Sequence, residues 1–147
     1  MEGGKQLMTF EPRYTLDMSQ INWGLMKARV AQDNFDNGRT AAQLQRSFEN
    51  SFEACVAMDP DDGPIGTARV LSDGVCNAYL VDVWTFTPYR HRGIARAMID
   101  LLLARLQGQH VYTFTDDVVE FYKRLGFCER PTGLERVVGK WLVSNPD

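Results

Sequence analysis

The sequence of 147 residues predicts one α/β domain with a mixed sheet, and three observations lead to this fold class. Hydrophobic residues make up 44% of the chain, which suffices for one sizeable core, and no shift in composition marks a second domain. Apolar stretches that suit strands fill the middle of the chain, with helical spacing before and after them. A strand, a helix and a strand then follow one another, which favours a parallel pair within an otherwise antiparallel sheet. We expect the domain to cover residues 7–147, after a flexible leader at residues 1–6.

Helix-capping patterns place two helices before most of the sheet. Asp17 followed by Gln20 has the pattern of an N-cap with its capping partner, and Thr40 with Gln43 repeats that pattern. The first helix is expected to bury Ile21, Leu25 and Ala28, and the second Ala41, Leu44 and Phe48. A later helix, which we expect to be the longest, begins near Ile94.

Apolar stretches predict the strands of the sheet, over residues 7–16, 52–58, 65–71, 75–86 and 110–115. Turn-forming sequence at residues 59–64 makes a hairpin of the second and third of these strands. The strand over residues 75–86 is almost uninterrupted in its apolar character, so we expect it at the centre of the sheet. Apolar residues around Phe127 and from Val137 to Val143 are expected to form closing strands.

The composition narrows the classes of function. A net charge of −3 provides no field for holding a nucleic-acid backbone, whereas an acidic surface suits a small cationic amine. The three cysteines show no Cys-x-x-Cys pattern and are odd in number, which indicates neither a disulfide framework nor a metal site. We therefore expect no metal and a reducing compartment, the cytoplasm. No apolar run reaches the ~18 residues of a membrane-spanning helix, so we expect no membrane partner.

The segment from Arg90 to Arg96 comes where the central strand is followed by a helix. Unpaired backbone amides and the positive end of the helix converge at such a place, which makes it a seat for a phosphate or pyrophosphate. Gly93 lacks the Cβ that would keep a phosphate away from the backbone, and Ala95 keeps the first turn slim. Positive charge comes from Arg90, His91, Arg92 and Arg96. The alternative is that Gly93 eases a tight turn and the arginines solvate a helix start. The spacing matches neither a Walker A loop nor a dinucleotide fingerprint.

Two motifs, in this order, resemble those of the GNAT N-acetyltransferase superfamily. Its Arg/Gln-x-x-Gly-x-Gly/Ala signature matches Arg90, Gly93 and Ala95, and its later Tyr-x-x-x-Gly-Phe signature matches Tyr122, Gly126 and Phe127. The order of elements agrees over residues 7–143, and the similarity is closest over residues 82–127. The loop at Pro88 and Tyr89 is one residue shorter than is usual in the superfamily.

The resemblance implies the GNAT acyl-CoA N-acyltransferase fold, with a mainly antiparallel sheet, helices on both faces and a central parallel splay. Acetyl-CoA would bind in the splay between the strands that end at Phe86 and Thr115. The implied cofactor contacts are backbone groups of Trp84, Thr85 and Phe86 for the pantetheine arm, the turn at Arg90 with the amides of His91, Arg92, Gly93, Ile94, Ala95 and Arg96 for the pyrophosphate, and Thr115. Transfer would be direct, which leaves the cysteines no nucleophilic role.

Two residues are candidates for catalysis. Tyr122 resembles the tyrosine that protonates the departing thiolate, since a phenol is neutral at pH 7 and can donate its O–H. The alternative is that Tyr122 only completes an apolar stripe with Val118 and Leu125. Asp82 interrupts the apolar central strand and matches a histidine that serves as base in arylalkylamine acetyltransferases of the superfamily, so it is the candidate general base. It could equally anchor a neighbouring loop or bind a cationic substrate.

The function expected from this reading is N-acetylation of a primary amine of a small molecule. The candidate acceptor contacts are Asn22, Trp23 and Met26 on the early helix and Tyr79 on the central strand. An acetyltransferase for peptide or protein amino groups is the second hypothesis, and a CoA-binding regulatory module without turnover is the third. A homodimer is expected only by analogy with the superfamily.

Overall fold

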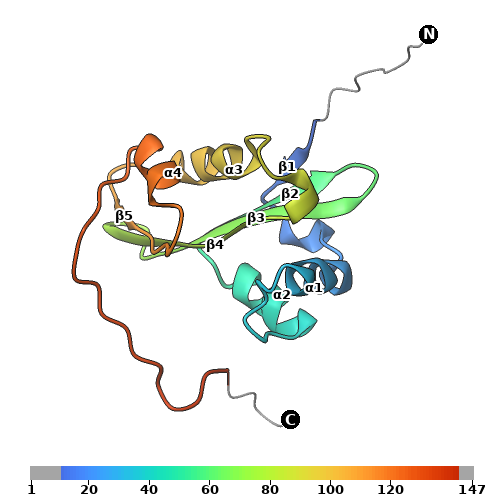
Figure 1. The fold of residues 1–147 in the computed structure, drawn as a ribbon, viewed down its shortest axis with the longest axis horizontal. Helices are drawn as coiled ribbons and strands as arrows, with labels where there is room; N and C mark the ends of the chain where they lie inside the picture. Colours follow the sequence, from blue (N-terminus) through green and yellow to red (C-terminus); the bar gives the residue numbers. More distant parts are fainter. Residues whose placement is uncertain (1–10, 143–147) are drawn as a thin grey trace.

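The structure is a computed structural model that describes residues 11–142. A five-stranded sheet forms the middle layer, with α3 (Ile94–Leu103) and α4 (Val119–Arg124) on one face and α1 (Trp23–Gln32) and α2 (Ala41–Glu49) on the other (Figure 1). Two short 3-10 helices, η1 (Met18–Gln20) and η2 (Thr87–Tyr89), precede α1 and α3. The predicted class, a mixed α/β fold with helices on both faces, is confirmed.

The strands are β1 (Arg13–Thr15), β2 (Glu53–Asp59), β3 (Gly63–Ser72), β4 (Asn77–Thr85) and β5 (His110–Tyr112). They lie side by side in sequence order, and every neighbouring pair is antiparallel except β4 and β5, which are parallel. The crossover through α3 therefore gives the parallel pair expected from the sequence. Residues 7–10 of the predicted first strand lie outside the described residues.

The two predicted helix caps had different outcomes. Thr40 and Gln43 form a complete capping box: Thr40 Oγ1 accepts from the Gln43 amide at 3.1 Å, and Gln43 Oε1 accepts from the Thr40 amide at 2.9 Å. Asp17 is an N-cap, but only of the short η1: its carboxylate accepts from the amide and hydroxyl of Ser19 and, at 3.4 Å, from the side chain of its predicted partner Gln20. Asn22 caps α1, accepting from the Leu25 amide at 3.0 Å. The buried side chains of α1 are Trp23, Met26 and Val30. Of the three predicted, Ile21 is buried just before the helix, whereas Leu25 is only partly buried and Ala28 is exposed.

The core lies between the sheet and the helices on each face. On α3 the buried side chains are Ile94, Met98, Ile99 and Leu102. Gly66 of β3 allows this close packing, since a Cβ there would lie 3.1 Å from the Met98 side chain and 3.3 Å from that of Ile94. The prediction that this helix is the longest is wrong, because α1 and α3 both have 10 residues.

The predicted closing strands are absent from residues 127–142, which run as an irregular segment beyond α4 (Figure 1). Pro131 has no N–H to donate to a ladder, and Thr132, Gly139 and Leu142 have positive φ, which interrupts an extended strand. Val143 lies outside the described residues. As a result, the apolar side chains of this segment stay exposed, with Leu134 at 90% and Val138 at 84%. Within residues 11–142, the helices are too short or too polar to cross a bilayer.

Candidate active site

The turn between β4 and α3 presents an open helix start. Gly93 is the N-cap of α3, with φ +78°, and within the described chain no side chain caps this helix. A Cβ on Gly93 would meet nothing within 4 Å, so the space beside this residue is open. His91 is also left-handed, with φ +67°, which helps to turn successive amides toward one side. Free amides at the positive end of a helix can bind a phosphate or pyrophosphate.

The basic side chains of this turn lie at the surface. Arg90 is exposed and donates its Nε to the Thr85 carbonyl at 3.1 Å. The Arg92 guanidinium lies 5.5 Å from the centre of the Tyr89 ring. Arg96 faces Asp100 one helical turn away at 3.9 Å, and both side chains are exposed. These contacts leave positive charge around the helix start, which favours an anionic ligand.

Strands β4 and β5 separate soon after they pair. The parallel ladder covers only Asn77 to Tyr79, and β5 ends at Tyr112 rather than at the predicted Thr115. The Thr113 hydroxyl then donates to the Leu80 carbonyl at 2.9 Å, and the described residues show no further pairing between the two strands. Beyond this point β4 pairs only with β3, so one edge of β4 is open from Val81 to its end. This is the splay that the superfamily resemblance implied.

The three predicted contacts for a pantetheine arm lie along this open part of β4. The side chains of Trp84 and Phe86 are buried, with 2% and 7% of their surface exposed, so only their backbone groups could meet a ligand. The Phe86 amide donates to the Ile65 carbonyl on β3, and the Thr85 carbonyl accepts from Arg90. Some backbone groups of the predicted arm site therefore already have partners within the chain.

Asp33, which sequence reasoning placed only in a turn-prone stretch, lies directly beneath the turn. Its carboxylate accepts from Trp84 Nε1 at 2.9 Å, from the Thr87 amide at 3.0 Å and from the Thr87 hydroxyl at 2.8 Å. Partial burial acts to raise the pKa of Asp33, but the hydrogen bonds from Thr87 and Trp84 outweigh it and hold this pKa below the ordinary value. No signal near Asp33 in the sequence could have identified partners 51 and 54 residues away.

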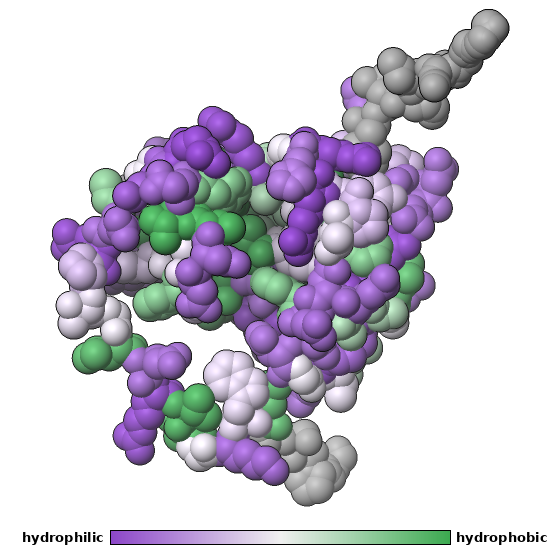
Figure 2. Space-filling model, viewed as in Figure 1, coloured by the Kyte–Doolittle hydropathy of each residue, from purple (hydrophilic) through white to green (hydrophobic). Residues whose placement is uncertain are grey.

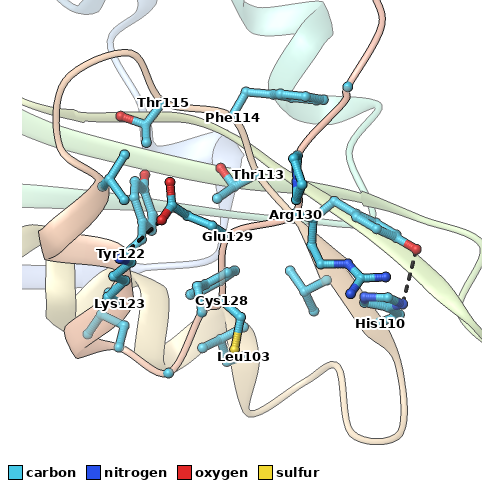
Figure 3. Close-up of a pocket in the computed structure, with 18 of the residues that line it drawn as sticks. Leu103, His110, Thr113, Phe114, Thr115, Tyr122, Lys123, Cys128, Glu129 and Arg130 are labelled. Atoms are coloured by element: carbon cyan, nitrogen blue, oxygen red, sulfur yellow. Dashed lines mark hydrogen bonds and ion pairs between the residues drawn. The ribbon is translucent and has the colours of Figure 1, made fainter.

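A groove of about 980 Å3 runs beside β5 and contains Tyr122 (Figure 3). Its walls are β5 with the residues after it, α4, and residues 126–133. Figure 2 shows apolar surface in this part of the molecule, beneath α3 and α4. Thr115 also lines the groove, and its hydroxyl accepts from the Val118 amide at 3.2 Å.

Tyr122 is suited to donate a proton. Burial raises the pKa of its phenol, against a smaller opposing effect of the neighbouring Thr113 side chain, so the hydroxyl stays neutral at physiological pH. Thr113 is also the residue that bonds to Leu80 where β4 and β5 separate, which puts Tyr122 next to the start of the splay. Its ring packs edge-on against Phe121 and Phe127 at 5.0 and 5.5 Å, so the residue contributes to the core as well.

Asp82 lies at a bulge in β4. Thr67 of β3 pairs with Trp84 while Arg69 pairs with Val81, so β4 has one extra residue in between. Asp82 has φ +54°, and the Thr67 hydroxyl donates to its carbonyl at 2.7 Å. A non-glycine residue in this left-handed region is strained unless its surroundings fix it.

Two arginines bind the Asp82 carboxylate. Arg39 donates Nη1 and Nη2 to its two oxygens, both at 2.9 Å, and Arg69 donates Nε at 2.6 Å. Only 8% of Asp82 is exposed, and burial alone would raise the pKa of its carboxyl, but the two guanidinium groups lower that pKa. A carboxylate so stabilised is a weak base, which favours the anchoring alternative for Asp82. Sequence reasoning missed both arginines, which lie 43 and 13 residues from Asp82.

The predicted acceptor contacts are not brought together. Asn22 is the exposed cap of α1, whereas Trp23 and Met26 point into the core, with 8% and 0% of their surface exposed. Tyr79 on β4 is partly exposed and packs edge-on against Phe114, with ring centres 5.8 Å apart. Of the four, only Asn22 and Tyr79 are accessible to a substrate.

Comparisons with known proteins agree with this geometry. The model of the acetyltransferase (GNAT) family matches residues 17–127. A Xanthomonas campestris protein assigned to the GNAT family has a solved structure similar to this one, with a TM-score of 0.74 and 29% identity. That similarity covers 87% of this chain and 94% of the other.

Curated relatives match over shorter stretches. A chloroplastic serotonin N-acetyltransferase of Oryza sativa is 31% identical over 103 residues, which are 65% of this chain and 52% of that protein. A histone acetyltransferase of Glycine max is 36% identical over 75 residues, which are 48% of this chain and 32% of that protein. This chain thus spans about half or less of the length of these two relatives.

Proposed function

Because this chain belongs to the GNAT acetyltransferase family, we propose that it transfers an acetyl group from acetyl-CoA to a primary amine of a small molecule. The observation that carries this proposal is the uncapped start of α3, which faces open space at the end of a strand with a free edge. Amides left without protein partners at a helix start fit the pyrophosphate of a CoA ester. Acetyl-CoA is then a co-substrate, and no metal is needed.

The contacts with acetyl-CoA follow from this placement. The amides from His91 to Arg96 would bind the pyrophosphate, with Arg90 and Arg92 adding charge at the rim. The open edge of β4, from Trp84 to Phe86, would bind the pantetheine arm through the backbone groups that remain free. Thr115 would contact the cofactor from the far side of the splay, since it lines the groove beside β5.

In the transfer, the amine nitrogen bonds to the acetyl carbon and the carbon–sulfur bond breaks. We assign Tyr122 to donate its phenolic proton to the departing sulfur, a role supported by its neutral, buried hydroxyl beside the splay. The amine must also lose a proton. That Asp82 accepts this proton stays a prediction. Its two arginine partners favour an anchoring role instead, in which case water would accept the proton from the amine.

A small-molecule acceptor is supported by the size of the groove that contains Tyr122. Its volume of about 980 Å3 is at the upper end of the range for small-ligand sites. Asn22 and Tyr79 remain the proposed acceptor contacts, because both are accessible. The peptide or protein alternative is favoured by the similarity to the histone acetyltransferase of Glycine max.

One experiment separates these proposals. Coenzyme A binding is measured by calorimetry, and thiol release from acetyl-CoA is followed with polyamines, arylalkylamines and lysine peptides. We expect binding and thiol release with a small amine. Release with peptides alone would select the protein acetyltransferase, and binding without any release would select the regulatory module. Absence of coenzyme A binding would reject the proposed function.

We also propose that the protein is cytoplasmic and forms a homodimer. Cys55, Cys76 and Cys128 are free thiols, which suits a reducing compartment, and fractionation of cells would test this.

A dimer is supported by exposed apolar side chains near the unpaired side of β5 and on residues 134–142, among them Phe114 and Leu134. Light scattering that gives a monomer mass at micromolar concentration would reject the dimer.

A further inference from the structure

The loop between α1 and α2 contacts β4 at two points. Asp33, at its start, bonds to Trp84 and to Thr87 just after the strand, and Arg39, at its end, bonds to Asp82 in the bulge. One short segment thus supports both features of β4 on which the proposed function depends. The bulge lies in β4 and the phosphate-binding turn follows the strand; residues 33–39 supply groups that hold both, together with Arg69 and Thr67 at the bulge.

The backbone of Asp33 is held in place by hydrogen bonds to the end of α1. It is the C-cap residue of α1, and its amide donates to the carbonyls of Arg29 and Ala31. The next turn is closed by the Phe35 amide, which donates to the Val30 carbonyl at 2.7 Å. The carboxylate therefore projects from a fixed helix end, and both of its oxygens are used by the β4–α3 turn.

Asp33 bonds to Thr87, the residue at which the chain leaves β4 and enters the turn before α3. Thr87 is the first residue of η2, and its carbonyl accepts from the Arg90 amide at 3.2 Å. Fixing the amide and hydroxyl of Thr87 therefore fixes the path toward Gly93, the N-cap of α3, which has no side-chain cap. An anion site of backbone amides gains affinity when its geometry is set before the ligand arrives.

We propose that Asp33 is a positioning residue for acetyl-CoA, which couples α1 to the phosphate-binding turn on the other side of the sheet. It acts through Thr87 and Trp84, not by touching the ligand. This inference rests on the proposed function, because it assumes that the turn binds the pyrophosphate. Binding of coenzyme A would accordingly reduce the motion of the α1 end and of residues 33–39.

The test compares Asp33→Asn with Asp36→Asn. The first change keeps the shape of the side chain, but it removes the charge and replaces one of the two acceptor oxygens that face three donors. Asp36 lies in the same loop and pairs with Lys27, without a described contact to β4, which makes it a matched control. We expect Asp33→Asn to weaken coenzyme A binding about tenfold or more, and Asp36→Asn by less than about twofold.

A second readout separates positioning from general stability. Hydrogen exchange of residues 29–39 is measured with and without coenzyme A; we expect added protection in the wild type and in Thr87→Ser, which keeps the hydroxyl. That protection should be reduced in Asp33→Asn and in Thr87→Val. Comparing Thr87→Ser with Thr87→Val tests the positioning role even if Asp33→Asn fails to fold, because these variants alter the same hydrogen bond at its donor.

The outcomes are distinct. Unchanged coenzyme A affinity in both Asp33→Asn and Thr87→Val would overturn the role of Asp33 while leaving the proposed function intact. Equal losses in Asp33→Asn and Asp36→Asn would also overturn it, because they would reflect loop stability alone. A wild-type protein that does not bind coenzyme A would reject the proposed function and this role together.

Discussion

The bulge within β4 and the turn that follows β4 differ in whether their polar groups have partners within the protein. At the bulge, the Asp82 carboxylate is buried and bound by Arg39 and Arg69, and its carbonyl accepts from Thr67. At the β4–α3 turn, the amides after Gly93 have no capping side chain and the arginines are exposed. Buried polar groups that are fully paired indicate structural support, whereas oriented donors without a partner indicate a ligand. The difference separates the bulge, whose polar groups are paired within the protein, from the turn that we propose to bind acetyl-CoA.

The largest effect is expected at the bulge. Asp82→Asn removes the charge that compensates two largely buried arginines, and should lower the free energy of unfolding by about 3–5 kcal/mol. Urea unfolding measures this loss. Asp100→Asn, at an exposed pair, is the control and should stay within about 0.5 kcal/mol. An equally small effect of Asp82→Asn would mean that the bulge does not depend on this charge.

The lowered pKa of Asp82 also predicts that the protein becomes less stable at acid pH. The folded state lowers the pKa of Asp82, so the unfolded chain binds more protons as the pH falls below about 4. The stability from this group is therefore present above the unfolded pKa and is lost as the pH falls through the folded pKa. Melting temperatures between pH 6 and pH 2 should fall at the acid end in the wild type, and less steeply in Asp82→Asn.

Tyr122→Phe tests whether the groove beside the splay carries out chemistry. Loss of the phenolic proton should reduce kcat about a hundredfold with whichever amine turns over, while coenzyme A affinity changes by less than about twofold. Tyr14→Phe, a partly buried tyrosine on β1, is the matched control. A wild-type kcat in Tyr122→Phe would leave Tyr122 as a core residue only.

Gly93→Ala tests whether the start of α3 binds coenzyme A. The added Cβ enters open space at the N-cap of α3, beside the proposed phosphate site, and φ at this position is +78°. We expect coenzyme A affinity to fall about tenfold or more, with a stability loss of about 1–2 kcal/mol from the left-handed backbone. Gly108→Ala, also left-handed with open surroundings but after α3, should cost similar stability without the loss of affinity.

The smallest effect is expected at the exposed pair on α3. Arg96→Gln removes one charge near the helix start, and the pair with Asp100 is long and exposed. Stability should change by less than about 0.5 kcal/mol, and coenzyme A affinity by only a few-fold. A large loss of affinity would make Arg96 a direct phosphate contact rather than part of the surrounding charge.

Local patterns in the sequence were sound where both partners lie within one helical turn. The capping box of Thr40 and Gln43 is confirmed because its partners are three residues apart. At Asp17 the predicted partner Gln20 also bonds to the carboxylate, at 3.4 Å, but the pair opens only the 3-10 helix η1, and Asn22 caps α1. A capping pattern shows which residue can begin a helix, but not which of two neighbouring candidates does so.

The closing strands show a different limit. The apolar residues near the end of the chain have strand-like composition, yet Pro131 and left-handed residues such as Gly139 interrupt them. A strand forms only with a partner, and the sequence does not specify that partner. On the first helix, the buried face is set by packing against the rest of the core, which places Trp23, Met26 and Val30 inside and leaves Ala28 exposed.

By itself, the sequence determined the mixed α/β class, the order of most elements and the place of the proposed anion-binding motif, because these depend on periodicity and on residues close together in the chain. Only the tertiary structure decided which charges are paired: Asp82 with Arg39, and Asp33 with Trp84 and Thr87. Those partners are tens of residues apart, and electrostatic interactions depend on distance in space and on burial. The carboxylate that suggested a base in the sequence thus proves to be bound by two arginines, which favours an anchoring role.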